Sequence, residues 1–249
     1  MLNRNATNLS AALIFGCAIL AFGTAARADG VLQATLAEPR EKTQEVSTEQ
    51  LRRILVDGSA IVVDARPHQE YVAGHIPGAQ NINGPPATQV AALEKLVNGD
   101  KSKALVLYCN GPFCQASKRL ADKLVAAAFT NVRRYQLGMP VWRALGGPTA
   151  IELEGVVRIF KVDNTATYID ARSADDFAKG WLPGAHNIPA DKFDTHQLPW
   201  DDFNRRVVLF GRDGEQARAL AKILSTKAWN NVSYFPGSFD ALMAAVGTK

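Results

Sequence analysis

The sequence predicts an α/β fold made of two tandem domains, each a mostly parallel sheet flanked by helices. One observation is a duplication. Residues 63–82 (VDARPHQEYVAGHIPGAQNI) and 169–188 (IDARSADDFAKGWLPGAHNI) share many identities at a single offset without a gap. A second observation is that short apolar runs rich in β-branched residues alternate with segments whose apolar residues recur at helical spacing. Such alternation favours a parallel sheet covered on both faces.

The N-terminal segment has the layout of a secretory signal peptide. Arg4 precedes an apolar run over 11–22, and small residues then lead to an A-R-A tripeptide at 26–28. An uncleaved membrane anchor is the alternative, but the run falls short of the about 20 residues that a membrane span needs. We expect residues 1–28 to be removed, which leaves a periplasmic protein without a stable membrane anchor. Residues 29–45 are expected to form a linker.

Removal of this segment changes both the charge and the cysteine count. Two cations, Arg4 and Arg27, and no acidic residue are lost, so the formal net charge falls from +4 to +2. A charge this small, without a basic cluster interleaved with aromatic residues, argues against a nucleic-acid partner. Cys17 is lost as well, so the mature chain keeps only Cys109 and Cys114.

The first domain is expected over residues 46–150. Its first helix contains LRRIL and follows Ser47, which forms a capping-box pattern with Gln50. Apolar, β-branched runs predict strands at 60–65, 104–109 and 132–137, the last at an edge or flank of the sheet. Helical spacing predicts helices at 88–97, 115–128 and 139–145. Pro140 suits the first turn of the last helix, where its missing N–H is not needed.

The second domain is expected over residues 151–249. The boundary falls near LGGPTAIELEG, 145–155, because Gly-Gly-Pro interrupts regular structure. RVVLFG at 206–211 parallels ALVLYC at 104–109, and later matches follow at a shorter offset. The second repeat therefore has the same order of elements with a shorter interior.

Cys109 ends a predicted buried strand, and a helix begins a few residues later. In open α/β sheets, ligands bind where loops leave the carboxyl ends of strands. Main-chain N–H groups of this loop and the following helix N-terminus could stabilise a thiolate and lower the pKa of Cys109. A buried structural cysteine and a Cys109–Cys114 disulfide are the alternatives. The candidate substrate-binding residues are Asn110, Gly111, Pro112, Phe113, Cys114, Gln115 and Ala116.

The repeated motifs DAR…Y…GHIPGAQNI and DAR…F…GWLPGAHNI resemble those of the rhodanese family, and the resemblance covers nearly the whole mature chain. It implies two tandem rhodanese-like domains and a sulfurtransferase in which Cys109 takes sulfane sulfur and holds it as a persulfide. Thiosulfate or a persulfide would be the donor, a thiol or cyanide the acceptor, and neither a metal nor an organic cofactor would be required. Gly211 stands at the matching position of the second repeat, which implies a catalytically inactive domain that covers the active face of the first.

The loop departs from the family pattern, because a typical rhodanese loop carries an arginine after the cysteine and CNGPFCQAS has none. An anionic donor benefits from a nearby cation. Arg66 is expected instead to support the fold by pairing with Asp64. Gln115 stands where related phosphatases carry an arginine, which argues against phosphatase chemistry. The remaining candidates for an anion contact are Lys118, Arg119 and Arg143.

Cys114 adds a second possible chemistry. Its thiol could displace the persulfide as a resolving thiol, and a periplasmic thiol carrier could reduce the resulting Cys109–Cys114 disulfide. Two other classes of function stay open. One is a thiol–disulfide redox protein that uses Cys109 and Cys114 as its couple, and the other is a non-enzymatic module whose paired domains bind a partner.

Overall fold

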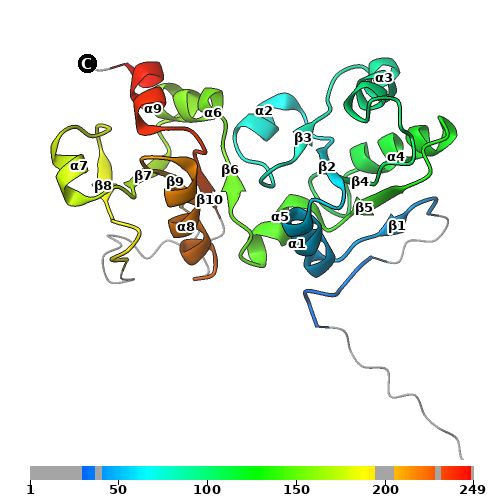
Figure 1. Cartoon of the computed structure of the whole chain (residues 1–249), viewed down its shortest axis with the longest axis horizontal. Coiled ribbons are helices and arrows are strands. Elements are labelled where there is room, and N and C mark those ends of the chain that lie inside the picture. The colour runs from blue at the N-terminus through cyan, green and yellow to red at the C-terminus, as the bar shows by residue number, and fades with distance from the viewer. Residues whose placement is uncertain (1–29, 37–40, 194–204, 228–230, 248–249) are drawn as a thin grey trace, which may run out of the picture.

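The computed structural model describes residues 30–36, 41–193, 205–227 and 231–247. The predicted signal peptide, residues 1–28, lies outside these ranges. Among the helices that are described, none combines the length and the apolar character needed to cross a membrane. Two α/β domains lie side by side, and strand β6 (Thr149–Ala150) runs between them (Figure 1).

The first domain is built on a five-stranded sheet in the order β1-β5-β4-β2-β3, and every neighbouring pair is parallel. The strands are β1 Gln44–Glu45, β2 Ile61–Asp64, β3 Gln80–Asn81, β4 Leu105–Tyr108 and β5 Val132–Tyr135. β5 lies between β1 and β4, so the prediction that it forms an edge or flank is wrong. The sheet begins at Gln44, inside the segment predicted as a linker, because β1 pairs with β5.

The helices of the first domain follow the predicted order. The capping box is present, since the Ser47 hydroxyl accepts from the Gln50 N–H at 3.1 Å and the Gln50 Oε1 accepts from the Ser47 N–H at 2.7 Å. The helices are α1 Thr48–Asp57, α2 His68–Val72, α3 Pro86–Leu96, α4 Ala116–Ala126 and α5 Gly138–Ala144. Val62 and Val106 pack into one apolar cluster and Val63 and Leu107 into another, so both faces of the sheet are covered.

The second domain repeats this plan. Its sheet has the order β6-β10-β9-β7-β8, again with only parallel pairs. The further elements are β7 Ala166–Asp170, β8 Ala185–Asn187, β9 Arg206–Phe210, β10 Val232–Tyr234, α6 Leu153–Arg158, the π-helix η1 Ile159–Asp163, α7 Ala174–Ala178, α8 Gly214–Ser225 and α9 Phe239–Val246. The sheet begins at Thr149, two residues before the range 151–249 expected from the sequence.

The Asp-x-Arg motif of each repeat forms the same buried support. In the first domain, Arg66 Nη2 donates to the Asp64 carboxylate at 2.6 Å and to the Gly74 carbonyl at 2.8 Å. Asp64 also accepts from the Tyr108 hydroxyl at 2.6 Å. The matching Arg172 Nη2 donates to Asp170 at 2.7 Å. Asp64 and Arg66, for which the sequence predicts a supporting role, form a buried ion pair. Through Arg66 this pair connects the end of β2 to the loop after α2.

Main-chain contacts join the two domains. His75 and Ala150 exchange two N–H···O bonds of 2.9 Å, and the Glu152 N–H donates to the Val72 carbonyl at 3.0 Å. A Cβ at Gly155 would lie 2.0 Å from that same carbonyl, so only glycine permits α6 to approach α2 so closely. The second domain is therefore held against the loop that follows α2.

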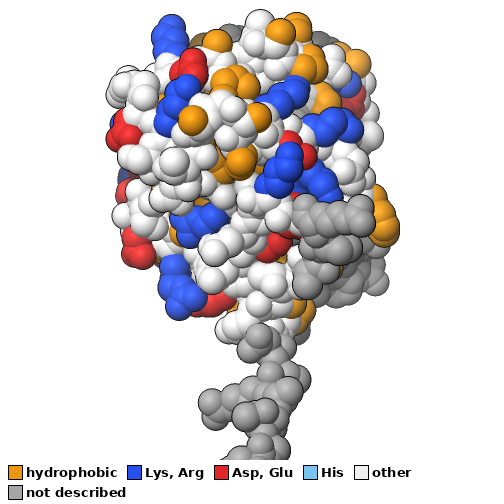
Figure 2. All heavy atoms as spheres, turned by 90° about the vertical axis from the view of Figure 1, so that its right-hand side faces the viewer, with side chains coloured by type: hydrophobic (Ala, Val, Ile, Leu, Met, Phe, Trp, Pro, Cys, Tyr) orange, Lys and Arg blue, Asp and Glu red, His pale blue; other side chains and the backbone are white. Residues whose placement is uncertain are grey.

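The outer face of the first domain carries Lys and Arg side chains mixed with acidic and uncharged ones (Figure 2). Two ion pairs of the first domain are partly exposed: Lys101 Nζ lies 2.7 Å from a Glu94 oxygen, and Lys42 Nζ lies 3.8 Å from an Asp122 oxygen. Both signs of charge are therefore interspersed on this face of the molecule.

Candidate functional site

Cys109 follows β4 directly, at the carboxyl end of the first sheet, as the sequence predicts. Its side chain is buried, with 2% of the residue exposed. The thiol donates to the Cys114 carbonyl at 3.3 Å, and the Ser117 hydroxyl lies 3.3 Å from the same sulfur. Cys109 and Cys114 are both free thiols, so the structure does not contain the alternative of a structural disulfide between them.

Burial raises the pKa of the Cys109 thiol to about 11, and the contact with Cys114 adds to the shift, while the hydroxyl and amide of Ser117 lower it. The expectation that the loop lowers this pKa is wrong for the observed conformation. The physical reason is visible in the loop. The Cys114 N–H donates to the Gly111 carbonyl instead of the sulfur, and Pro112 has no N–H.

The other residues of the loop differ in their exposure to solvent. Gly111 is buried at a φ of 100°, a conformation that favours glycine. Phe113 is 96% exposed at the tip of the loop, and Gln115 is exposed at the start of α4. Asn110 is exposed and donates through Nδ2 to Glu70 at 2.5 Å. Pro112, Cys114 and Ala116 are half-buried.

Two residues build the site without having been assigned to it from the sequence. Ser117 contacts the sulfur, although its position suggests only a helix start. Gly138, at a φ of 62°, lets α5 approach the loop, since a Cβ there would lie 2.3 Å from the Cys109 carbonyl and from the Gly111 nitrogen. The Met139 N–H accordingly donates to the Cys109 carbonyl at 3.1 Å. The match between Gly138 and Gly237 of the second repeat was the available signal.

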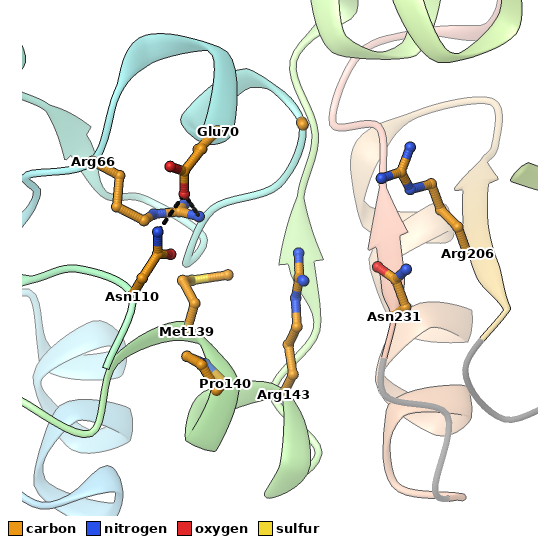
Figure 3. A pocket seen from close by; sticks show the side chains of 9 residues that line it. Arg66, Glu70, Asn110, Met139, Pro140, Arg143, Arg206 and Asn231 are labelled. Carbon is orange, nitrogen blue, oxygen red and sulfur yellow. Dashed lines mark hydrogen bonds and ion pairs between the residues drawn. The ribbon is translucent and has the colours of Figure 1, made fainter. Parts of the chain in front are cut away.

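A cavity of about 410 Å³ lies beside the loop, between the two domains (Figure 3). The first domain contributes Arg66, Glu70, Ala73, Asn110, Met139, Pro140 and Arg143, and the second contributes Arg206 and Asn231. Of these, Asn110 is the immediate neighbour of Cys109 in the chain. Both domains therefore line the cavity, and it adjoins the loop that follows Cys109, although Cys109 itself is not among the lining residues.

The three cations proposed for an anion contact lie in different places. Arg143 lines the cavity. Lys118 pairs with Glu41 at 2.7 Å, and Arg119 is exposed on α4 outside the lining. Arg66 lines the cavity too, although Asp64 already neutralises it.

The second domain has no thiol at the matching position. Gly211 follows β9, and α8 begins at Gly214 behind an N-cap from Asp213. A Cβ at Gly211 would lie 2.9 Å from Gln216 Oε1, which accepts from the Arg212 N–H. The loop of the second domain is therefore shorter and is closed by its own side chains.

Comparisons with known proteins agree with this architecture. The family described as "Rhodanese-like domain" matches residues 47–145 and 158–245. The chain is similar to a thiosulfate sulfurtransferase, GlpE, of Pseudomonas entomophila, with 32% identity over 101 residues that make up 41% of this chain and 85% of the relative. A tRNA uridine(34) hydroxylase of Hamiltonella defensa is 33% identical over 115 residues, 45% of this chain and 31% of the relative.

An HTH-type transcriptional regulator of Mycobacterium tuberculosis, Rv0324, is 40% identical over 91 residues, or 36% of this chain. The chain spans 38% of that regulator's length. Among solved structures, the anaerobic ergothioneine biosynthesis enzyme of Chlorobium limicola has a TM-score of 0.39 and 16% identity, over 82% of this chain and 61% of that one. Both halves match the same family, so the chain belongs to the rhodanese family as a tandem of two rhodanese-like domains.

Proposed function

We propose that the protein is a sulfurtransferase that carries sulfane sulfur on Cys109 as a persulfide. Membership of the rhodanese family, which includes the similar thiosulfate sulfurtransferase of Pseudomonas entomophila, supports this type of activity. The single observation that carries the proposal is the free thiol of Cys109 at the carboxyl end of β4, in a loop whose Asn110 lines the cavity between the domains. The second repeat contains no cysteine, and Gly211 stands at the matching position.

Two displacements at sulfur make up the reaction. The Cys109 thiol first loses its proton to solvent, and the thiolate attacks the outer sulfur of the donor. A new S–S bond forms at Cys109 as the donor's own bond to that sulfur breaks, and its electron pair leaves on sulfite or a thiolate. An acceptor thiolate or cyanide then attacks the outer sulfur of the persulfide, and the Cys109 thiolate departs.

In the observed conformation of the loop, the Cys109 thiol is held in its protonated form. A pKa of about 11 means that the thiol is mostly protonated at pH 7. Ionisation is favoured by whatever brings N–H donors or a cation closer to the sulfur. Release of the Cys114 carbonyl from the sulfur would also favour ionisation, because that carbonyl accepts a hydrogen bond from the neutral thiol alone.

Cys114 is suited to act as the resolving thiol, since it lies in the same loop and is half-buried. Its thiolate would attack the Cys109 sulfur, release the outer sulfur as sulfide and leave a disulfide between the two residues. The thiol carrier that would reduce this disulfide, and the periplasmic location, stay predictions from the sequence.

Transfer to cyanide tests the proposal. With thiosulfate or a polysulfide as donor, the wild-type protein is expected to form thiocyanate, and Cys109→Ser is expected to form none. Cys114→Ser is the matched control from the same loop and should still form thiocyanate. Thiocyanate formation by Cys109→Ser contradicts the proposal, while its loss in both variants favours the thiol–disulfide alternative.

A further inference from the structure

A second cavity between the domains lies away from the Cys109 loop. Its volume is about 540 Å³, and it shares no lining residue with the cavity beside that loop. Helices α1 and α5 of the first domain line one part of it, and α8 and β10 of the second domain line another. Figure 1 shows α1 and α5 on one side of β6 and α8 on the other. The volume falls within the range of small-molecule binding sites.

The wall that the first domain contributes is apolar and fixed in position. Trp142 Nε1 donates to the Pro148 carbonyl at 3.0 Å. A Cβ at Gly147 would lie 2.3 Å from Trp142 Cε2, so only glycine lets the main chain lie against the indole ring. Leu55 and Val56 extend this surface along α1, and Val56 is 83% exposed. The apolar part of a ligand would therefore meet a preformed surface.

The two domains come close together at Gly146, which also lines the cavity. Its φ is 76°, and a Cβ there would lie 3.2 Å from the Ser225 carbonyl oxygen at the end of α8. This close approach holds α8 against the end of the first domain. The cationic side chains of α8 thus face a cavity whose other wall is apolar.

Three cations line this cavity, and none of the described residues in its lining is acidic. Arg218 and Lys222 lie four residues apart on α8, where two like charges on one helix face repel each other. Both side chains are exposed, and neither forms an ion pair with a carboxylate in the part of the chain that the structure describes. Their charges are therefore not neutralised within the cavity.

Arg52 of α1 is the third cation, and its neighbours are neutral groups. Its Nη2 donates to the Leu145 carbonyl, and its guanidinium carbon lies 6.0 Å from the centroid of the Trp142 ring. A carbonyl and an indole ring fix the position of this guanidinium without a counter-charge. The fixed guanidinium thus adds to the positive charge of the cavity.

Tyr234 of β10 adds a neutral polar group to the same lining. Burial raises the pKa of its hydroxyl, and Arg218 offsets part of the rise. The hydroxyl therefore keeps its proton at neutral pH and can donate a hydrogen bond to an oxyanion.

We propose that this cavity binds a small organic anion with an apolar body, whose acidic group contacts Arg52, Arg218 and Lys222. Charge-assisted hydrogen bonds from these cations would supply the missing counter-charge interaction. An inorganic anion would leave the apolar wall unused, and an uncharged apolar compound would leave the cations unpaired. Cys109 is not part of this site, so the inference goes beyond sulfur transfer and does not depend on it.

Two fluorescent probes with the same ring system test the proposal. The probe 8-anilinonaphthalene-1-sulfonate carries an acidic group, whereas N-phenyl-1-naphthylamine carries none. The sulfonate probe is expected to saturate at about one molecule per chain and to bind several-fold more tightly than the uncharged probe. Added salt should weaken the sulfonate probe alone, because the cations are partly exposed. Cys109→Ser should bind both probes as the wild-type protein does.

Substitution of the exposed cations assigns the binding to this cavity. Arg218→Gln and Lys222→Gln are each expected to weaken the sulfonate probe several-fold, as for partly exposed charges, and to leave the uncharged probe within about twofold. Arg53→Gln removes the same charge from an exposed position of α1 outside the lining. This matched control should leave the affinities for both probes unchanged.

Three results would overturn the proposal. They are the lack of saturable binding of the sulfonate probe, an affinity that Arg218→Gln and Lys222→Gln leave unchanged, and an equal loss for both probes in these variants. None of them bears on the persulfide function of Cys109, which thiocyanate formation tests separately. Thermal unfolding of each variant checks that the fold is retained, so a loss of affinity is assigned to the missing charge.

Discussion

Cys109 is subject to opposing influences on its proton. Burial and the contact with Cys114 favour the neutral thiol, whereas the hydroxyl and amide of Ser117 favour the thiolate. The balance leaves the pKa at about 11 in the observed conformation. Ser117 is therefore the neighbour on which the reactive form of Cys109 depends.

Replacement of Ser117 tests this dependence. Ser117→Ala removes the hydroxyl 3.3 Å from the sulfur, so the pKa of Cys109 should rise further and persulfide formation at neutral pH should slow several-fold. The measurement is the rate of persulfide formation as a function of pH, whose midpoint should move to higher pH. Ser225→Ala, a buried serine of α8 whose hydroxyl has no partner among the described residues, is the control. An unchanged midpoint in Ser117→Ala would show that the hydroxyl does not act on the thiol.

The same pKa shift predicts how stability depends on pH. The pKa of Cys109 is higher in the folded chain than its ordinary value of 9.0. Ionisation therefore opposes folding: the stabilising contribution is complete below about pH 9 and is lost as the pH rises toward about 11. The free energy of unfolding of wild type minus that of Cys109→Ser should fall across this window, because other groups cancel in the difference. A difference that stays constant from pH 8 to 11 would contradict the shift.

At the scale of elements, the duplicated Asp-x-Arg support gives a comparison inside one chain. Asp64→Asn and Asp170→Asn each break a buried ion pair, and each should lower the free energy of unfolding by roughly 3 kcal/mol. Only Asp64→Asn should also slow persulfide formation, because Arg66 lines the cavity beside the active loop. Denaturant unfolding and a mass-based persulfide assay under native conditions measure the two effects. Equal losses of activity in both variants would argue against a local role for the first pair.

The sequence predicted those elements whose signals are local. The Ser47–Gln50 capping box and the apolar spacing of the later helices locate their elements within a few residues. The strand β5, which was predicted at an edge or flank, contains Arg134. Arg134 is in fact 1% exposed and is paired with Glu41 and Glu45, from the segment predicted as a linker. A charge neutralised by residues distant in sequence leaves no periodic pattern to detect.

In the candidate site, too, the sequence predicts the features that depend on local signals and misses those that depend on packing. The position of Cys109 follows from the strand pattern and the family motifs, and both are local. The buried environment that raises its pKa, and the contributions of Gly138, Arg206 and Asn231, depend on how α5 and the second domain pack against the loop. Such packing brings together residues far apart in the chain, so the sequence alone does not reveal it.

At the scale of the whole molecule, the two repeats face each other unequally. The first domain presents the loop after β4, at the carboxyl ends of its strands, to the shared cavity. The second domain presents the amino ends of β9 and β10, while Gly211 lies at the opposite end of β9. The two repeats therefore contribute one loop that carries a cysteine and one lining surface, instead of two equivalent sites.

A cysteine restored to the second repeat should therefore gain no activity. Gly211→Cys places a thiol where α8 begins only three residues later, and its Cβ would lie 2.9 Å from Gln216. The same Cβ would also lie 3.2 Å from the Ala217 nitrogen and from the Asp213 carbonyl oxygen, so the backbone of the short loop crowds the position where an outer sulfur would be held. In the Cys109→Ser background, the variant should acquire no persulfide by mass analysis. A persulfide at residue 211 would show that loop length does not limit the second domain.

The most direct test of the account is mass analysis of the protein after incubation with thiosulfate or a polysulfide. The wild-type protein should gain one sulfur, about 32 Da, on the peptide that holds Cys109, and the gain should disappear on incubation with cyanide. Cys114→Ser should acquire the same sulfur and Cys109→Ser should not. A gain that persists in Cys109→Ser, or that maps to Cys114 alone, would contradict the assignment of Cys109 as the sulfur carrier.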